Sequence, residues 1–305
     1  MKQVNYPLIL EPIYKERVWG GERLLPGREN IGESWVLSVR PDDDVRVANG
    51  EYAGKKLGDL IRLHPEFLGV HSSDEDFPFL IKFIDSKEAL SIQVHPDDET
   101  ALVLGCERGK TEMWYIIKAE PDAYIYYGIR DGIDLDDLKN EVLNGDDPTA
   151  YLNKVYVRAG DCFLIAGGTP HAIGAGIYLA EIQQNCDTTF RIYDYGRLGL
   201  DGAPRALHRR EAAIAIKKSL GSNERKGDRL ASCEYFESSI INLDGKAELN
   251  ALTHSFTSLT VISGEGRIIC TDSEYHFAAG DELFIPAGRE EYLLDGSAAI
   301  IKTTI

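Results

Sequence analysis

Three short motifs in the first half of the chain carry residues that could bind a metal ion. The first places Gln93 and His95 two positions apart in an apolar run. The second places Glu112 directly before the apolar run 113–117, and the third places His171 after a glycine-rich turn. Two imidazoles, a carboxylate and an amide oxygen can bind a divalent ion such as zinc and leave room for a substrate. The motifs therefore predict a metal site at the edges of several strands.

Strand geometry supports this grouping. Alternate side chains of an extended strand share a face, so Gln93 and His95 would point the same way while Ile92 and Val94 enter the core. A buried, unpaired Glu112 would be costly, and coordination of a cation removes that cost. Gln93 is the weakest member of the set, because a neutral amide is a poor zinc ligand and could instead orient a water molecule.

Size and charge limit the function further. The chain has 305 residues, enough for two domains, and a formal charge of −17 from 50 acidic and 33 basic residues. Nucleic acid and anionic membranes require a basic face, so neither is expected as a partner. A protein of this charge that binds an anion must gather a few cations at its site.

The compartment predicted from the sequence is the cytoplasm. The five cysteines show no Cys-x-x-Cys spacing, which argues against a disulfide framework or a thiolate zinc site. The N-terminus lacks the apolar core of a signal peptide, and no apolar stretch is long enough to cross a bilayer.

Short β-type runs separated by Gly and Pro predict a mainly β fold of the sandwich or barrel type. Helical spacing is confined to the segments 56–63, 135–143 and 206–220. In the last of these, Leu207, Ile214 and Ile216 are expected on the buried side.

An internal repeat runs through the β regions. Segment 159–171 recurs as 279–291, and each copy combines a Gly-Asp turn, an apolar strand and a Gly-containing turn. In the second copy Glu291 stands where the first has its histidine, and Thr257 stands where the first has its glutamate. Only the first copy keeps the ligands, which predicts one metal site per chain.

A polar, turn-rich stretch at 221–228 predicts a linker and a domain boundary near residue 230. Domain 1–230 would carry the metal site, with small helical segments at about 131–150 and 204–222. Domain 231–305 would be a degenerate β domain without metal ligands.

Several motifs resemble those of a known protein family. Gly160, Gly168 and His171 follow the second cupin motif. Type I mannose-6-phosphate isomerases in their compact bacterial form have motifs similar to segments 18–21, 91–96, 110–115, 168–172 and 187–194. The resemblance covers nearly the whole chain. It implies two cupin-like jelly-roll β domains with a few short helices inserted.

The same resemblance implies a zinc-dependent aldose–ketose isomerase. One Zn²⁺ per chain would be held by His95, Glu112 and His171, with Gln93 as the further ligand. The implied reaction interconverts mannose 6-phosphate and fructose 6-phosphate through an enediol. A small sugar phosphate would then be the binding partner.

The resemblance also assigns roles to residues around the metal. Lys110 and Arg191 are implied as catalytic residues, with Arg191 stabilising negative charge on substrate oxygens. Lys110, Glu181 and Asp187 are implied to contact the substrate. From the residues alone, Arg191 could instead form a salt bridge with Asp187 or Asp194.

Two other functions fit parts of the pattern. A non-catalytic sugar-phosphate-binding cupin, acting as a sensor or regulator, could dispense with the metal, and the complete ligand set argues against it. A metal-dependent cupin dioxygenase could use iron in the same set. The cations Lys110 and Arg191 suit an anionic substrate and favour isomerisation. Lys110, Glu181, Asp187 and a metal-bound hydroxide all remain open as proton carriers, and the oligomeric state is open as well.

Overall fold

A computed structural model of the chain describes residues 6–70, 77–218, 225–288 and 290–305. The chain folds into two compact units, each assembled from segments that are separate in the sequence. Unit 1 combines described residues of 1–13, 35–81 and 225–305, and unit 2 combines those of 14–34 and 82–224.

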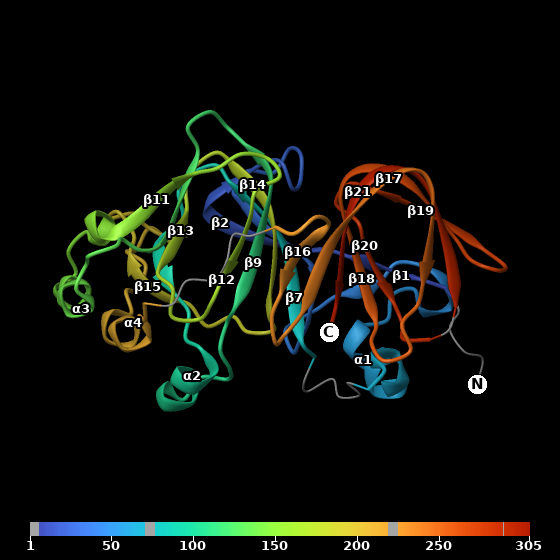
Figure 1. Ribbon diagram of the computed structural model, residues 1–305, viewed down its shortest axis with the longest axis horizontal. Helices are drawn as coiled ribbons and strands as arrows, with labels where there is room; N and C mark the ends of the chain where they lie inside the picture. Colours follow the sequence, from blue (N-terminus) through green and yellow to red (C-terminus); the bar gives the residue numbers. More distant parts are fainter. Residues whose placement is uncertain (1–5, 71–76, 219–224, 289) are drawn as a thin grey trace. The chain divides into compact units, whose positions relative to one another are not determined.

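Unit 2 is built from two antiparallel sheets (Figure 1). Within the described residues, one sheet has the order β12-β9-β14-β7-β2-β3 and the other the order β11-β10-β13-β8-β15. The first contains β2 (Ile13–Gly21), β3 (Ile31–Leu37), β7 (Phe79–Ser86), β9 (Glu112–Ala119), β12 (Cys162–Ile165) and β14 (Ile177–Gln184). The second contains β8 (Ile92–Val94), β10 (Tyr124–Ile129), β11 (Leu152–Tyr156), β13 (His171–Ile173) and β15 (Phe190–Tyr193). Parts of β3 and β7 belong to unit 1.

One hydrophobic core joins the two sheets of unit 2. Trp114 and Phe163 enter it from the six-stranded sheet, and Ile125 and Ile173 enter it from the five-stranded sheet. Side chains of both sheets therefore interdigitate, as in a β sandwich.

A second core lies on the other face of the five-stranded sheet, where α3 (Leu135–Asn144) and α4 (Arg209–Ala215) pack. Ile92 and Val94 of β8 belong to this core, together with Leu138 and Ala212 of the two helices. Because side chains alternate along a strand, Gln93 faces away from the helices. The predicted orientation of β8 is confirmed.

Two of the three predicted helices are confirmed by α1 (Leu57–Leu63) and α3. The third is shorter than predicted, because Ile216 has extended backbone angles and ends α4. Ile216 is buried as expected and Leu207 is half-buried, but the prediction for Ile214 is wrong, since its side chain is 51% exposed. Small residues, including Ala212, occupy the buried side of α4 instead. Residues 219–222 of the predicted segment lie outside the described residues.

The sequence patterns missed one helix, α2 (Asp98–Leu104), in unit 2. Its N-terminus is capped by the Asp97 carboxylate, which accepts from the Thr100 backbone N–H at 2.9 Å. Gly105 ends the helix in the left-handed conformation, with φ +68°. The sequence signal for α2 was the spacing between Asp97 and Gly105, because the helix is too short to show a clear apolar period.

Unit 1 contains a sheet of order β16-β17-β21-β18-β20-β1-β6 in the described part of the chain, with β19 paired to β18. Its strands are β1 (Leu8–Glu11), β6 (Arg46–Val47), β16 (Arg229–Ser232), β17 (Glu237–Asn250), β18 (Thr257–Ile269), β19 (Glu274–Ala278), β20 (Glu282–Ile285) and β21 (Glu291–Thr304). The remaining short elements are β4 (Val39–Arg40), β5 (Asp43–Asp44) and the 3-10 helices η1 (Gly50–Tyr52) and η2 (Pro65–Leu68), with η3 (Pro148–Tyr151) in unit 2. The mainly β fold with few short helices confirms the predicted class.

The observed division differs from the predicted boundary at residue 230 in one respect. Segments near the N-terminus belong with the C-terminal strands, because β1 pairs antiparallel with β20 and β6 extends the sheet beyond β1. Leu8 lies opposite Phe284 in this pairing. Pairing between segments so far apart in sequence leaves no local pattern from which to predict it.

The internal repeat is confirmed by strand register. In unit 2 Glu112 lies opposite Ile165 across β9 and β12, and in unit 1 Thr257 lies opposite Ile285 across β18 and β20.

No helix in the described residues combines the length and apolar character needed to cross a membrane.

Candidate metal centre and active site

The three strongest ligand candidates come from strand ends in both sheets of unit 2. His95 directly follows β8, Glu112 begins β9 and His171 begins β13. All three side chains are buried, and their ligand atoms lie within 4.8 Å of one another. Residues 76 positions apart in sequence thus form one compact cluster, as the motifs predict.

Backbone carbonyls fix the orientation of both imidazoles. His95 Nδ1 donates to the Thr188 carbonyl oxygen at 2.9 Å, and His171 Nδ1 donates to the Thr169 carbonyl oxygen at 2.8 Å. A carbonyl can only accept, so the proton of each neutral ring is on Nδ1. The lone pair on each Nε2 therefore points into the cluster, as in many metal sites.

Acceptor atoms face one another at the centre of the cluster. His95 Nε2 lies 3.4 Å from Glu112 Oε2, and His171 Nε2 lies 3.3 Å from Glu112 Oε1. Within the described structure, Glu112 Oε1 is buried without a hydrogen-bond partner. The Lys110 ammonium reaches two of these acceptors from the edge of the cluster, and the N, N, O donor set itself suits a divalent metal ion.

The protonation states fit the same interpretation. Burial lowers the pKa of His171 to about 4 and holds the pKa of His95 well below its usual value. Both rings are therefore neutral near pH 7 and able to coordinate metal. Burial, with the nearby Glu181, raises the pKa of Glu112 to about 7.

Gln93 lies next to this cluster. It is the direct cross-strand neighbour of His171, and its amide group is 3.4 Å from His171 Nε2. Rotation of the amide by 180° would turn its oxygen toward the same centre. The geometry thus suits either metal coordination or the positioning of a water molecule.

Lys110 brings a buried positive charge to the edge of the cluster. Its Nζ donates to Glu112 Oε2 at 2.7 Å and to His95 Nε2 at 3.1 Å. Burial disfavours the ammonium, but Glu112 and Glu181 outweigh this effect and raise the pKa of Lys110. Lys110 is therefore an ammonium ion at neutral pH.

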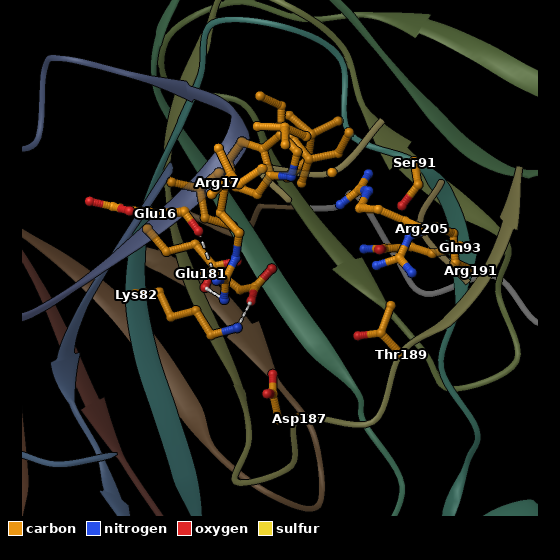
Figure 2. A pocket seen from close by; sticks show the side chains of 18 of the residues that line it. Glu16, Arg17, Lys82, Ser91, Gln93, Glu181, Asp187, Thr189, Arg191 and Arg205 are labelled. Carbon is orange, nitrogen blue, oxygen red and sulfur yellow. Dashed lines mark hydrogen bonds and ion pairs between the residues drawn. The ribbon is translucent and has the colours of Figure 1, made fainter. Parts of the chain in front are cut away.

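A cavity of about 600 Å³ opens beside the cluster in unit 2 (Figure 2). Gln93 and Lys110 form part of its wall near the candidate metal ligands, and the predicted residues Glu181, Asp187 and Arg191 line it as well. The structure therefore brings every candidate site residue of the sequence to this cluster or to the adjoining cavity.

Comparisons with known proteins identify the family. Residues 9–124 match the catalytic domain of type I phosphomannose isomerases, and residues 227–305 match the cupin domain of mannose-6-phosphate isomerases. Mannose-6-phosphate isomerase ManA of Bacillus subtilis is 37% identical over 97% of this chain and 98% of its own length. The chain belongs to the mannose-6-phosphate isomerase family. Membership confirms the predicted resemblance and the prediction that the chain is an isomerase.

Other members of the family agree with this assignment. Mannose-6-phosphate isomerase of Streptococcus mutans is 35% identical, with 97% of each chain covered. The crystal structure of mannose 6-phosphate isomerase from Bacillus subtilis superposes with a TM-score of 0.89 at 34% identity, covering 98% of this chain and 99% of that one. The fold of this isomerase is therefore shared along its whole length.

Lys82, a buried residue of this isomerase, was not predicted from the sequence. Lys82 Nζ lies 3.3 Å from Glu181 Oε1, and Trp114 Nε1 donates to Glu181 Oε2 at 2.8 Å. Burial raises the pKa of Glu181, but Lys110 and Lys82 outweigh it, so the pKa is lowered overall. A lysine inside the apolar strand 79–84 was the available signal, since lysine is rarely buried without a partner.

Two cavity arginines were also missed. Arg17 forms a two-pronged ion pair with Glu33, with distances of 3.2 Å from Nε to Oε1 and 2.9 Å from Nη2 to Oε2. Arg205 lines the cavity near Arg191. Neither sits in a distinctive motif, so only the fold reveals them.

Proposed function

We propose that this chain interconverts mannose 6-phosphate and fructose 6-phosphate, with one zinc ion held by His95, Glu112 and His171. The observation that carries the proposal is the meeting of two imidazole lone pairs and a buried carboxylate beside a cavity whose wall includes Lys110 and Arg191. Family membership supports the substrate, because the relatives are named for mannose 6-phosphate. Gln93 would complete the metal site or position a water molecule.

The chemical difficulty is the removal of a proton from carbon beside a carbonyl group, because the reaction moves a proton between C1 and C2. Zinc held by His95, Glu112 and His171 would supply a Lewis acid that stabilises negative charge on the sugar oxygens. The residues of the chain must bind the sugar, add further positive charge and carry the proton.

Lys110 and Arg191 would supply that additional positive charge. Lys110 remains an ammonium ion, so it suits hydrogen bonding to a substrate oxygen better than removal of a proton from carbon. Arg191 is the cross-strand neighbour of Gln93 and lines the same cavity. Its guanidinium can bind substrate oxygens without losing its proton.

Among the predicted proton carriers, Asp187 is the best candidate for the base. Both carboxylate oxygens of Glu181 are already in contact, one with Lys82 and one with Trp114. Glu181 would therefore anchor the two lysines and contact sugar hydroxyls. Asp187 is an exposed carboxylate on the cavity wall, free to approach a bound substrate.

The two alternatives are weaker. A sensor cupin would bind the sugar phosphate without turnover, and a dioxygenase would require a redox-active metal. Membership of an isomerase family favours isomerisation over both. The cytoplasmic location stays a prediction from the sequence.

A coupled assay tests the proposal. Metal-free protein would be loaded with zinc, and the formation of fructose 6-phosphate from mannose 6-phosphate would be followed before and after addition of a chelator. Zinc binding would be measured separately by calorimetry on wild type and His171→Ala. We expect turnover with zinc, its loss with chelator, and loss of both binding and turnover in His171→Ala.

Glu291→Gln is the matched control, because Glu291 occupies the position of His171 in the second copy of the repeat. Its activity and zinc content should equal those of wild type. Absence of turnover at every metal loading would contradict the isomerase. Wild-type zinc binding in His171→Ala would contradict the assigned ligand set.

A further inference from the structure

Three arginines gather where the segment after β15 borders the cavity. Arg205 Nε donates to Asp194 Oδ2 at 2.7 Å and its Nη2 to Asp194 Oδ1 at 2.5 Å. Arg197 Nη2 donates to the same Oδ1 at 2.8 Å. Arg191 Nη1 donates to the Ala206 carbonyl oxygen, at 2.8 Å. One buried carboxylate thus holds two arginines, and a third lies beside them.

The three arginines have two carboxylates at ion-pair distance, since Arg197 Nη1 also lies 3.7 Å from Glu88 Oε2, so positive charge exceeds negative charge by one. Among the described residues, no carboxylate forms an ion pair with Arg191, and its buried Nε has no hydrogen-bond partner. The pKa of Arg191 is lowered first by burial and then by Arg205. In a chain of formal charge −17, such an excess of cations needs an anion to neutralise it.

Arg205 differs from Arg197 in one respect. Both bind Asp194, but Arg205 lines the cavity, whereas Arg197 reaches away to donate to the Ala89 carbonyl oxygen at 2.7 Å. Two of the five N–H donors of Arg205 contact Asp194 within the described structure, which leaves three for a ligand. Asp194 therefore fixes the orientation of the Arg205 guanidinium, whose remaining N–H groups can donate to a ligand.

The arginines lie at a defined distance from the metal ligands. His171, Gln93 and Arg191 are cross-strand neighbours on β13, β8 and β15. Two strand spacings, about 10 Å in all, therefore separate the backbones of His171 and Arg191. Arg205 lies beside Arg191, close to Gln93 and Ser91 (Figure 2). A sugar phosphate has its carbonyl and its phosphate at opposite ends, which matches this separation.

We propose that Arg205 binds the phosphate group of the substrate, next to Arg191, and thereby makes the enzyme specific for phosphorylated sugars. This inference rests on the proposed function, because it places the reacting carbons at the metal end of the cavity. A planar guanidinium can present two parallel N–H groups to a phosphate, and it remains charged at every relevant pH.

The test compares Arg205→Gln with Arg197→Gln, since both remove one arginine from Asp194 but only one of them faces the cavity. The measurements are kcat and KM for mannose 6-phosphate and the inhibition constant of inorganic phosphate. Arg205→Gln should raise KM and the phosphate inhibition constant by roughly 10- to 100-fold, with a smaller change in kcat. Arg197→Gln should change each by less than about twofold.

Arg205→Lys is the control for a folding defect, because it keeps a positive charge near Asp194. It should unfold at the wild-type temperature and show an intermediate loss of phosphate affinity. Wild-type KM and phosphate inhibition in both Arg205 variants would overturn the inference. Equal losses in Arg205→Gln and Arg197→Gln would also overturn it, because they would indicate only a weakened Asp194 network.

Calorimetric titration with inorganic phosphate separates this inference from the proposed function. Weaker phosphate binding by Arg205→Gln than by wild type supports the phosphate site even if the wild type fails to isomerise mannose 6-phosphate. Turnover by the wild type with unchanged phosphate binding in Arg205→Gln supports the isomerase and refutes the role of Arg205.

Discussion

The two units contain the same β motif but differ in the side chains that the motif carries. In unit 2 the Gly160 N–H donates to Ile116 and the Ile116 N–H to Asp161, and in unit 1 Gly280, Val261 and Asp281 repeat both hydrogen bonds. Gly160 and Gly280 both have positive φ, at +91° and +100°. The motif is therefore maintained by turns and apolar strands. It does not depend on the candidate metal ligands His95, Glu112 and His171, which lie in unit 2.

The surroundings of the buried carboxyl groups show a physical difference between the two units. Unit 2 surrounds Glu112 and Glu181 with Lys110 and Lys82, so cations balance the buried negative charge. Unit 1 buries Glu282 with no cation at ion-pair distance in the described residues. The hydroxyls of Ser258 and Thr260 donate to Glu282 instead, the latter at 2.6 Å.

The buried carboxyl groups thus have different surroundings in the two units. In unit 2 the balanced charges are arranged around a cavity, where they can act on a substrate. In unit 1 burial without a cation raises the pKa of Glu282 to about 7, which favours the neutral acid. The pKa of Glu112 is also raised to about 7, so the units differ in the lysines and the cavity beside the buried carboxyl groups, rather than in backbone geometry or in the direction of this shift.

The largest effect is expected from Glu112→Gln, which keeps the shape of the side chain but removes its charge. Zinc content should fall, and kcat/KM should drop on the order of a thousandfold, since metal assistance contributes several kcal/mol. Calorimetric zinc titration and the coupled assay measure both. Full zinc binding by this variant would show that Glu112 is not a metal ligand.

Lys82→Met should destabilise unit 2 by about 3 kcal/mol, because it leaves Glu181 with reduced compensation in a buried site. Urea denaturation measures the loss. Lys118→Met is the matched control: Lys118 is 59% exposed in its ion pair with Glu120, and its replacement should change stability by less than about 0.5 kcal/mol. Equal effects of the two variants would show that burial of the Lys82 ion pair has no consequence.

Glu282 should make the stability of unit 1 depend on pH. Its folded pKa of about 7 lies above the ordinary value of 4.5, so its contribution is complete below about pH 4.5 and is lost as pH rises through 7. The loss should reach about 3 kcal/mol by pH 8. Hydrogen exchange of β18 and β20 at pH 5 and pH 8 should show this in wild type and a smaller difference in Glu282→Gln. Identical pH dependence in both would refute the assignment.

The smallest effect is expected at Thr257, the counterpart of Glu112 in unit 1. Its hydroxyl is buried without a hydrogen-bond partner in the described structure. Thr257→Val should therefore leave activity unchanged and raise stability by about 1 kcal/mol. Thr260→Val, which removes a donor to Glu282, should lower stability by a similar amount, and thermal unfolding compares the two. A loss of stability in both variants would contradict the role of the unpaired hydroxyl.

The sequence by itself determined the β class, the internal repeat and the candidate metal ligands. Each of these is encoded in short segments: His95, Glu112 and His171 mark strand ends, and segments 159–171 and 279–291 carry the repeat. Such local signals persist because a strand end or a turn imposes its residue types wherever it occurs.

Only the tertiary structure decided which distant residues meet. It brought Lys82 to Glu181 and Arg205 to Arg191, and it joined β1 to β20 in the sheet of unit 1. It also left Ile214 exposed, because alanines fill the buried side of α4. These contacts depend on packing between segments far apart in sequence, and the spacing of residues within one segment carries no record of that packing.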